Sequence, residues 1–558
     1  MSERLIYLPL GGAGEIGMNA YVYGWGQPGR ERLILVDVGV TFGDMDSTPG
    51  IDLIMPDLSW LTENRDRLEA VFITHAHEDH VGALGHLYHK LQVPVYCRPF
   101  TGALAKMKLE EQGQPADAVR IVSPRPDTVK LGPMTVQFVP ISHSIPESSA
   151  LIIDTPGGRI VHTGDFKLDG TPVVGEGFDP ILWHDIAHEG QGIKVLTCDS
   201  TNIFSPQPGR SEALLKNPIL DFVMAQPEMV VATTFASNVA RVKTLAEAGV
   251  AAGRKVCLLG RAMRKMVTVA QETGVLSGFP PVIGPDEASE TPRDKLMLLV
   301  TGSQGERRAA SAQLARGRYL GLQLKEGDSF LFSSKTIPGN ERGVIRIMNA
   351  FSQMGVDVFD ADDGIYHVSG HANRPDIEAM HDLLKPQIVI PMHGEHMHLR
   401  EHMKLAQGKG IASAIVTNGT VMDLTTDRPR IVDEVETGRI YLDGSVLIGA
   451  MDGVVRDRIR MALNGHALVS VIVDEDDNLL PDAWVELSGL PAHGRAGVPL
   501  DRHIEGELAE FLEHADPRTV ASDTRLEEAI RKITRQVSME EIGKKPEVTV
   551  TISRLTAE

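Results

Sequence analysis

The feature that most constrains this chain of 558 residues is a run of six, His-Ala-His-Glu-Asp-His, at positions 75–80. An apolar run at 71–74 comes directly before it and has the composition of a buried strand. In an extended backbone His75 and His77 point the same way, so both imidazoles can reach one ion. Where the chain turns into a helix, the carboxylate and the last imidazole can face a second ion. Packing does not explain four such side chains in one short window, because buried polar groups must be paired. The run therefore predicts two neighbouring metal sites.

Further candidate ligands stand at the ends of other predicted strands. They follow the strand-like runs at 136–139, 159–161 and 388–390, in the segments Ser142–Ser144, His162–Asp165 and Pro391–Glu395. Each histidine, taken singly, is as readily explained by a structural or surface role. Together with the first run these segments offer nitrogen and carboxylate ligands without a thiolate. Such a set suits Zn²⁺ and tolerates Mn²⁺, so we expect two Zn²⁺ per chain, with Mn²⁺ as the alternative.

The spacing of apolar residues indicates several domains. The first stretch alternates short strand-like runs with turns rich in Gly, Pro and Asp, and helical spacing covers 81–91. A middle stretch alternates helical and strand-like segments, which is typical of a parallel sheet flanked by helices. Short strands then return, and the last part has the pattern of a separate unit of strands and amphipathic helices. We predict a core split into 1–208 and 350–445, an insertion at 209–349 and a C-terminal domain at 450–558.

The run Gly-Ala-Gly-Glu-Ile-Gly at 12–17 matches the dinucleotide-binding pattern GxGxxG, and Asp37 lies twenty residues past its end. That pattern requires a helix to open at the glycines, because the helix N-terminus holds the pyrophosphate. The residues at 18–24 are instead β-prone and are followed by Gly26 and Gly29. We interpret the run as a glycine turn that joins two strands.

The formal net charge is −20, which on its own argues against a nucleic-acid partner. The charge is uneven, however. Residues 209–345 carry 18 basic and 13 acidic side chains, whereas 450–558 carry 13 basic and 21 acidic ones. Phosphate contacts are local, so a basic stretch within an acidic chain permits RNA binding. A solvated surface with chance asymmetry explains the charges equally well.

Cysteine content and hydropathy restrict the cellular compartment. The three cysteines, Cys97, Cys198 and Cys257, are widely spaced, which excludes a disulfide framework and fits a reducing compartment. Apolar runs stay well below the roughly 18 residues of a membrane-spanning helix, and the N-terminal residues lack the apolar stretch of a signal peptide. We expect a cytoplasmic protein without membrane contact.

Five motifs together carry a family resemblance that covers roughly residues 1–450. They are Gly11–Gly17, Cys198–Asn202, Thr301–Glu306, His367–Ala372 and Pro391–Glu395. With them the chain resembles the β-CASP nucleases of the metallo-β-lactamase superfamily, and among these the bacterial ribonuclease J family. The resemblance implies an α/β fold: a metallo-β-lactamase αββα sandwich with an inserted β-CASP α/β domain. A small α+β C-terminal domain would follow.

The resemblance also implies which residues form the site. One ion would be bound by His75, His77 and His143, the other by Asp79, His80 and His393, with Asp165 bridging the two. Asp199 and His371 match later motifs and complete the expected catalytic group with Asp165. His371 is our candidate for the general acid, and Asp199 would orient either His371 or the metal ligands. Asp37 would hold a histidine or the active-site loop, or accept hydrogen bonds from backbone amides at a turn.

The activity implied by the resemblance is hydrolysis of RNA phosphodiester bonds in RNA maturation and decay. The family cuts internally and also trims from a 5′ end, preferring a monophosphate, which implies a small phosphate pocket. Two loops offer hydroxyls, amides and close backbone approach for it. The expected substrate-binding residues are His367, Ser369, Gly370, His371, Ser237 and Asn238. Ordinary loop chemistry explains Ser237 and Asn238 about as well.

Three other functions are compatible with parts of the pattern. A DNA nuclease of the same family shares the fold, and only contacts to a 2′-hydroxyl discriminate the two. A small-molecule hydrolase such as a lactonase is disfavoured by the insertion at 209–349, because so large a lid suits a polymer. A catalytically silent RNA scaffold is disfavoured by the complete ligand set.

The expected partners are RNA and further copies of the chain, as a homodimer or homotetramer. The C-terminal domain contains no ligand cluster, and its acidic balance argues against a primary role in gripping RNA. Its two amphipathic helices, predicted at 504–514 and 526–537, would contribute apolar faces to self-association. Completion of the domain's own core is an equally good explanation of those faces.

Overall fold

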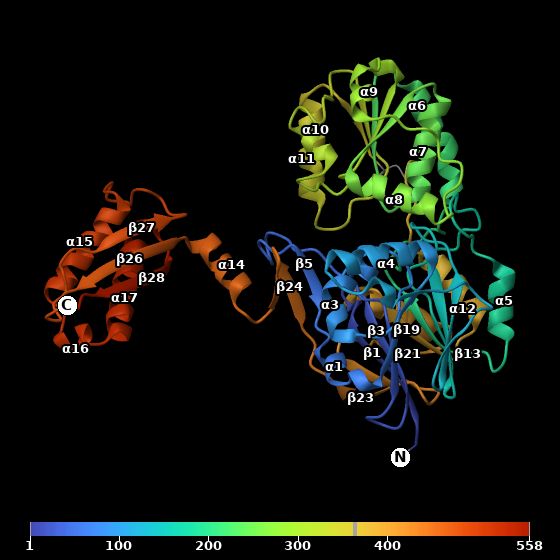
Figure 1. Ribbon diagram of the computed structural model, residues 1–558, viewed down its shortest axis with the longest axis horizontal. Helices are drawn as coiled ribbons and strands as arrows, with labels where there is room; N and C mark the ends of the chain where they lie inside the picture. The colour runs from blue at the N-terminus through green and yellow to red at the C-terminus, as the bar shows by residue number, and fades with distance from the viewer. Residues whose placement is uncertain (1, 361–364, 557–558) are drawn as a thin grey trace. The chain divides into compact units, whose positions relative to one another are not determined.

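The computed structural model describes residues 2–360 and 365–556, and it divides the chain into two compact units (Figure 1). The first comprises Met1–Thr41 and Met55–Arg439, and the second comprises Phe42–Ile54 and Ile440–Glu558. Each unit has an apolar core of its own. Within the parts described, no helix combines the length and the apolar composition that crossing a membrane requires.

Two sheets face each other in the first unit. In spatial order, the first sheet consists of β23 (Arg430–Glu434), β22 (Thr420–Asp423), β1 (Arg4–Gly11), β3 (Ala20–Gly26), β4 (Arg32–Val36), β6 (Leu68–Phe72), β7 (Val95–Cys97) and β8 (Val119–Ile121). The second consists of β21 (Ala412–Ser413), β19 (Ile388–Met392), β13 (Ile193–Asp199), β12 (Gly158–His162), β11 (Ser149–Thr155), β10 (Met134–Pro140) and β9 (Val129–Leu131).

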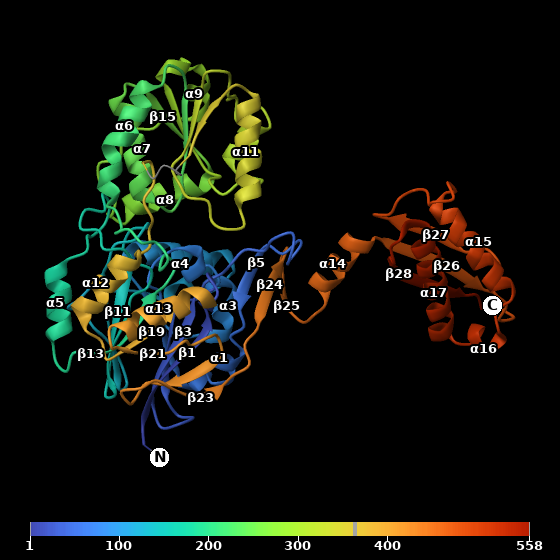
Figure 2. The same cartoon turned by 180° about the vertical axis from the view of Figure 1, so that it is seen from behind.

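Apolar side chains of both sheets fill the space between them. Phe72 of the first sheet and Phe138 of the second lie there with ring centroids 6.0 Å apart. Helices cover the outer faces: α3 (Leu84–Leu91) and α4 (Pro99–Glu111) beside the first sheet, and α5 (Pro180–His188), α12 (Arg374–Leu384) and α13 (His396–Gly408) beside the second (Figure 2). This order of layers confirms the predicted αββα sandwich.

The chain between β13 and β19 contains a third sheet, and all of its strands are parallel. Its spatial order is β15 (Lys255–Leu259), β16 (Leu296–Val300), β14 (Val230–Thr233), β17 (Ser329–Phe332) and β18 (Asp357–Phe359). One face packs on α6 (Lys216–Ala225), α7 (Val239–Ala251) and α8 (Arg261–Glu272). The other packs on α9 (Pro285–Glu290), α10 (Ala310–Ala315) and α11 (Glu341–Gln353). Helices on both faces account for strands that are apolar throughout, and they confirm the inserted α/β domain. Strand β18 lies beyond the boundary predicted at 349.

The second unit is an α+β fold, as predicted. Strand β26 (His466–Val473) pairs antiparallel with β27 (Trp484–Ser488) and parallel with β28 (Glu547–Arg554). Helices α15 (Leu500–Glu513) and α17 (Asp523–Ile542) bury their apolar faces on this sheet. The other elements are β5 (Leu53–Pro56), β24 (Arg439–Asp443), β25 (Val446–Gly449), α14 (Val454–Asn464) and α16 (Pro517–Val520). The helical faces therefore complete the unit's own core, the second of the two roles considered for them.

Two local features bear on the site. Strands β1 and β3 pair antiparallel up to Gly11 opposite Ala20, so the glycine run is the turn between strands that we predicted. The helix predicted at 81–91 is confirmed from Leu84 to Leu91, but it is interrupted near its start. The chain forms a short helix α2 (Glu78–Val81) and begins α3 at Leu84, because the Ala83 amide donates to Val38 O outside the helix, 3.0 Å away.

Candidate metal centre

The ends of neighbouring strands gather the predicted ligands at one edge of the sandwich. Strands β12, β13 and β19 are parallel, and β10 runs in the same direction because two antiparallel pairings separate it from β12. Their carboxyl ends lead into His143, Asp165, Asp199 and His393. Strand β6 of the facing sheet leads into the 75–80 run.

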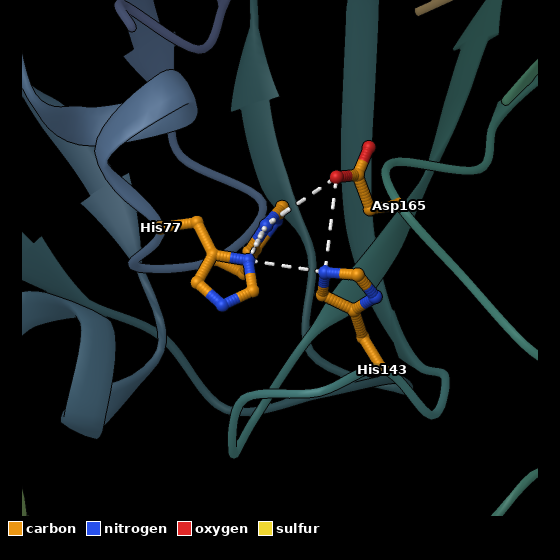
Figure 3. A group of neighbouring side chains, drawn as sticks. His77, His143 and Asp165 are labelled. Carbon is orange, nitrogen blue, oxygen red and sulfur yellow. Dashed lines mark hydrogen bonds and ion pairs between the residues drawn. The ribbon is translucent and has the colours of Figure 1, made fainter. Parts of the chain in front are cut away.

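A first group of donor atoms surrounds a point between His75, His77, His143 and Asp165. The Nδ1 atom of His77 lies 3.1 Å from Nε2 of His75 and 3.0 Å from Nε2 of His143. Figure 3 shows His77, His143 and Asp165 directed toward one another. Asp165 Oδ2 lies 3.8 Å from Nε2 of His75 and 3.7 Å from Nε2 of His143.

A second group contains Asp79, His80 and His393, and it shares Asp165 with the first. Asp165 Oδ2 lies 3.1 Å from Nε2 of His80, and Asp79 Oδ2 lies 3.2 Å from Nε2 of His393. The structure thus brings all seven predicted ligands together, and Asp165 lies between the two groups.

Three of the histidines form hydrogen bonds through the ring nitrogen that faces away from the centre, and these bonds fix the tautomer of each ring. Nδ1 of His143 donates to Gly370 O at 2.6 Å, and Nδ1 of His80 donates to Asp37 Oδ2 at 2.7 Å. The Thr74 hydroxyl donates to Asp37, so it accepts from Nδ1 of His75 at 3.0 Å. In the neutral imidazoles each inner Nε2 therefore carries a lone pair. These lone pairs lie close to His77 and Asp165, an arrangement that suits a metal site.

His393 and His371 are held by Asp199. The Thr201 hydroxyl donates to Asp199 Oδ1 at 2.7 Å and accepts from Nδ1 of His393 at 2.8 Å. The other oxygen, Asp199 Oδ2, accepts from Nδ1 of His371 at 2.7 Å. From the sequence, Asp199 was expected to orient either His371 or the metal ligands. In the structure it does both, because it binds His371 directly and His393 through Thr201.

Four buried or half-buried carboxylates surround the centre, and the ion pairs described for them involve only histidines. They are Asp37, Asp79, Asp165 and Asp199. Burial lowers the pKa of His77 to about 4, although Asp79 and Asp165 act to raise it. Burial also acts to lower the pKa of His393, but Asp165, Asp199 and Asp79 outweigh it and raise that pKa to about 10. The pocket therefore has an excess of negative charge that two divalent cations would neutralise.

Donor spacing and an unsatisfied atom test whether metal ions fit. Ligands about 2.0–2.2 Å from a tetrahedral Zn²⁺ are themselves about 3.3–3.6 Å apart, and the spacings here run from 3.0 to 3.8 Å. Among the described residues, the buried Asp165 Oδ1 has no hydrogen-bond partner. Buried oxygens without a partner are costly. The residues present fit two metal ions.

Two residues of the centre adopt backbone conformations that non-glycine residues rarely use. The φ angle is 64° at Asp37 and 51° at His393. Such strain persists where the surroundings enforce it and collects at functional sites. At Asp37 the conformation lets one buried carboxylate accept from the Thr74 amide at 2.8 Å and from His80. Its two predicted roles, holding a histidine and accepting from a backbone amide, are both present.

The loop expected to bind substrate lies beside the first group of ligands. Gly370 is packed so closely that an added Cβ would lie 2.9 Å from Cε1 of His143. Ser369 Oγ accepts from Asn202 Nδ2 at 2.8 Å and from the His371 amide at 3.1 Å. His367 Nδ1 lies 3.5 Å from Arg241 Nη1.

The other predicted binding loop contains Ser237 and Asn238. Asn238 is buried and caps α7, because its side-chain oxygen accepts from the Arg241 amide at 3.0 Å. Ser237 is half-buried in the turn before that helix. Asn238 thus has a structural role that accounts for its presence, and a binding role for either residue remains a prediction.

Sequence reasoning missed three polar residues that orient the ligands. Asn19 Nδ2 lies 3.0 Å from Nε2 of His80 and donates to Asp79 O at 2.9 Å. Thr74 and Thr201 link His75 and His393 to carboxylates. Thr201 lies within the motif at 198–202 and Thr74 directly precedes the run at 75–80, so both threonines could have been identified from the sequence. Nothing in the sequence near Asn19 indicates its contact with a helix 60 positions later.

Comparison with known families agrees with the fold and the centre. Residues 14–194 match the metallo-β-lactamase superfamily, and 227–351 match the ribonuclease J β-CASP domain. Residues 365–416 match a Zn-dependent metallo-hydrolase RNA specificity domain, and 453–555 match the ribonuclease J C-terminal domain. The fold and site thus define a metal-dependent hydrolase of the metallo-β-lactamase superfamily with a β-CASP insertion.

Whole-chain relatives narrow this class. A ribonuclease J from Sinorhizobium meliloti is 39% identical, over 99% of this chain and 98% of its own length. Ribonuclease J 1 of Streptococcus pyogenes is 35% identical over 84% and 83%, and a ribonuclease J from Mycolicibacterium smegmatis is 32% identical over 97% and 96%. A solved Enterococcus faecalis protein of unknown function, 17% identical with a TM-score of 0.53, covers 75% of this chain and all of its own, and shares the fold. The chain belongs to the ribonuclease J family, and is therefore a hydrolytic nuclease that acts on RNA.

Proposed function

We propose that this chain hydrolyses RNA with two metal ions held by the seven converging ligands. One observation carries the proposal: histidine lone pairs from separate strand ends converge on both sides of Asp165, each fixed by an outer hydrogen bond. Three His with Asp165 would hold one ion, and Asp79, His80 and His393 with the same Asp165 the other. We propose Zn²⁺ for both, with Mn²⁺ as the alternative.

When bound, the ions would lower the pKa of water and neutralise the charge of the phosphoryl group. The residues of the chain would supply the proton transfer. His371 is only partly exposed at the centre, and Asp199 holds its Nδ1, so Nε2 faces the remaining space. Burial acts to lower the pKa of His371, but Asp199 and Asp165 outweigh it and raise that pKa. We assign His371 as the general acid that protonates the leaving sugar oxygen, and Asp199 as the residue that positions it.

The 5′-phosphate pocket is proposed at the loop that contains Ser369 and Gly370. The Ser369 oxygen accepts two hydrogen bonds, so its own proton can donate to a phosphate oxygen. Burial, together with the positive charges of Arg241, Lys167, Lys335 and Arg210, lowers the pKa of nearby His367 to about 3. Positive surroundings of this kind suit a phosphate. We propose 5′-to-3′ trimming that prefers a monophosphate, together with internal cleavage, in RNA maturation and decay.

The decisive experiment incubates metal-loaded protein with 5′-labelled RNA and DNA of equal sequence. We expect cleavage of RNA, with monophosphorylated ends trimmed faster than triphosphorylated ones. Equal cleavage of DNA would instead favour the DNA-nuclease alternative. His77→Ala is the control, because it removes a metal ligand that belongs only to the first ligand group. It should abolish cleavage and lower the metal content while the fold persists. Full activity in a metal-depleted His77→Ala protein would contradict the two-metal proposal.

A further inference from the structure

A second cluster of ligand-type side chains lies behind the metal centre. It consists of Cys198 on β13, His381 on α12 and His402 on α13, and all three are buried. Successive residues of a strand point to opposite faces. Asp199 therefore faces the metal centre, whereas Cys198 belongs to the apolar layer under α12 and α13. The mechanism proposed above uses none of the three.

The donor atoms of this cluster are close together. Nε2 of His381 lies 3.1 Å from Nε2 of His402, and the two rings are stacked with centroids 5.2 Å apart. One ligand atom from each of the three residues lies within 4.8 Å of the others.

Hydrogen bonding leaves the cluster unsatisfied as it stands. The Ser200 hydroxyl donates to Cys198 O at 3.4 Å, so it accepts from Nδ1 of His402 at 2.9 Å. The Nε2 of His402 then carries a lone pair directed at His381. If His381 donates from Nε2 to that lone pair, its Nδ1 is an acceptor, and that buried atom has no partner in the described chain. That Nδ1 stays unpaired whether a proton or a cation lies between the two Nε2 atoms, so the close approach of the Nε2 atoms is the observation that points to a ligand.

The chemistry of the three groups is that of a zinc site. Burial lowers the pKa of His381 to about 4 and that of His402 well below its ordinary value, so both are neutral ligands. Burial raises the pKa of the Cys198 thiol, but binding of a soft cation releases the thiol proton. A thiolate with two imidazoles suits Zn²⁺.

We propose that Cys198, His381 and His402 hold a third, structural Zn²⁺ in each chain. This ion ties the end of β13, which carries Asp199, to two helices. Helix α12 begins at Arg374, shortly after His371, and α13 begins at His396, shortly after His393. The ion thus fixes the three elements on which the catalytic histidines and their aspartate depend.

Cobalt substitution tests this site separately from the catalytic centre. A Co²⁺–thiolate bond gives a near-ultraviolet charge-transfer band, and the catalytic ligands are all nitrogen and oxygen. Full-length protein produced in cobalt-supplemented medium should show the band. Cys198→Ser should lose it, whereas Cys257→Ser, the matched change of a buried cysteine on β15, should keep it. His77→Ala should also keep it, so failure of the two-metal proposal leaves this test intact.

Metal content gives an independent measurement. In His381→Leu an apolar side chain replaces the histidine in its apolar surroundings. By elemental analysis this protein should contain one equivalent of zinc less than the unmodified protein, with no loss of the remaining ions. The proposal is overturned if the unmodified cobalt protein shows no thiolate band, or if the band survives in Cys198→Ser. Equal zinc content of His381→Leu and the unmodified protein would overturn it as well.

Discussion

Four histidines of the metal centre, His75, His80, His143 and His393, are oriented through the nitrogen that faces away from it. The buried carboxylate of Asp37 holds His80 directly and His75 through the Thr74 hydroxyl. These two histidines belong to different ligand groups. One carboxylate thus sets the tautomer and direction of a ligand in both groups. Such partners affect metal affinity although they do not touch the metal.

Asp37→Asn should therefore weaken both proposed metal sites at once. The amide can no longer accept from both His80 and Thr74, so we expect a loss of about 10–100-fold in metal affinity. Competition with a chelator measures this loss. The matched control is Asp423→Asn, another buried aspartate of the first unit, which pairs with Arg430 away from the centre. An Asp37→Asn protein that retains both ions as tightly as the control would refute the role of Asp37.

Ser369 and His371 should differ in which cleavage mode they affect. Ser369→Ala removes a donor to the terminal phosphate and should slow 5′ trimming by about 10-fold or more, the effect of one hydrogen bond to a charged group. Internal cleavage needs no free end and should change little. His371→Ala should slow both modes by about 10²–10⁴-fold, because protonation of the leaving group is common to them. Rates on 5′-labelled linear RNA and on circular RNA separate the modes. If Ser369→Ala slows both equally, the pocket lies elsewhere.

The seven ligands could be predicted from sequence because each follows an apolar run, and strand ends meet at one edge of a sheet. Asn19 could not, because its bond to Asp79 exists only after a hairpin and a helix pack together. The break between α2 and α3 also escaped prediction. Residues 81–91 have helical spacing throughout, but the Ala83 amide forms its hydrogen bond with Val38 in another segment.

At the scale of elements, two ion pairs of the inserted domain differ in character: one lies within the domain, and the other joins it to α4. Arg241 of α7 is fully buried and donates to Glu212, with Nη2 2.9 Å from Oε2, and to Ser333 O at 2.8 Å. Lys265 of α8 pairs with Glu111 of α4 at 3.2 Å, but both side chains are largely exposed. Burial decides how much each pair contributes to stability.

Arg241→Met should destabilise the first unit strongly. It leaves the buried Glu212 with the longer ion pair to Lys167 Nζ, at 3.9 Å, and breaking a buried pair costs about 3–5 kcal/mol. Lys265→Met, the control, removes an exposed pair and should cost about 1 kcal/mol or less. Denaturant unfolding of the full-length chain measures both effects. The quantity to compare is the free energy of unfolding in the transition that involves the inserted domain. Equal shifts would show that the buried pair contributes no more than the exposed one.

At the scale of the whole molecule, the second unit bears on self-association. Its helices bury their apolar faces in the unit's own core. These faces are therefore not available for contacts between two chains. The opposite face of the β27-β26-β28 sheet is different. Ile472 and Trp484 are exposed there, and Trp484 pairs with Ser470, which lies on the same face as Ile472. We propose that this face mediates a homodimer or homotetramer.

Removal of residues 465–558 should therefore convert the assembled protein into monomers. The cut spares β24, β25 and α14 and removes the whole sheet with its helices. Sedimentation velocity measures the change. Trp484→Glu, which leaves the core intact, should act in the same direction. If both proteins sediment as the full-length chain does, the second unit has no part in association.

The centre is assembled from residues that are far apart along the chain. Asp79 meets His393 across 314 positions, and Asp199 meets His371 across 172, with the inserted sheet synthesised between them. During translation, the segment from His75 to Asp165 leaves the ribosome long before His371 and His393 are synthesised. A growing polypeptide of this kind carries an incomplete centre for most of its synthesis. A nascent chain cannot complete the proposed centre until both late histidines have been synthesised.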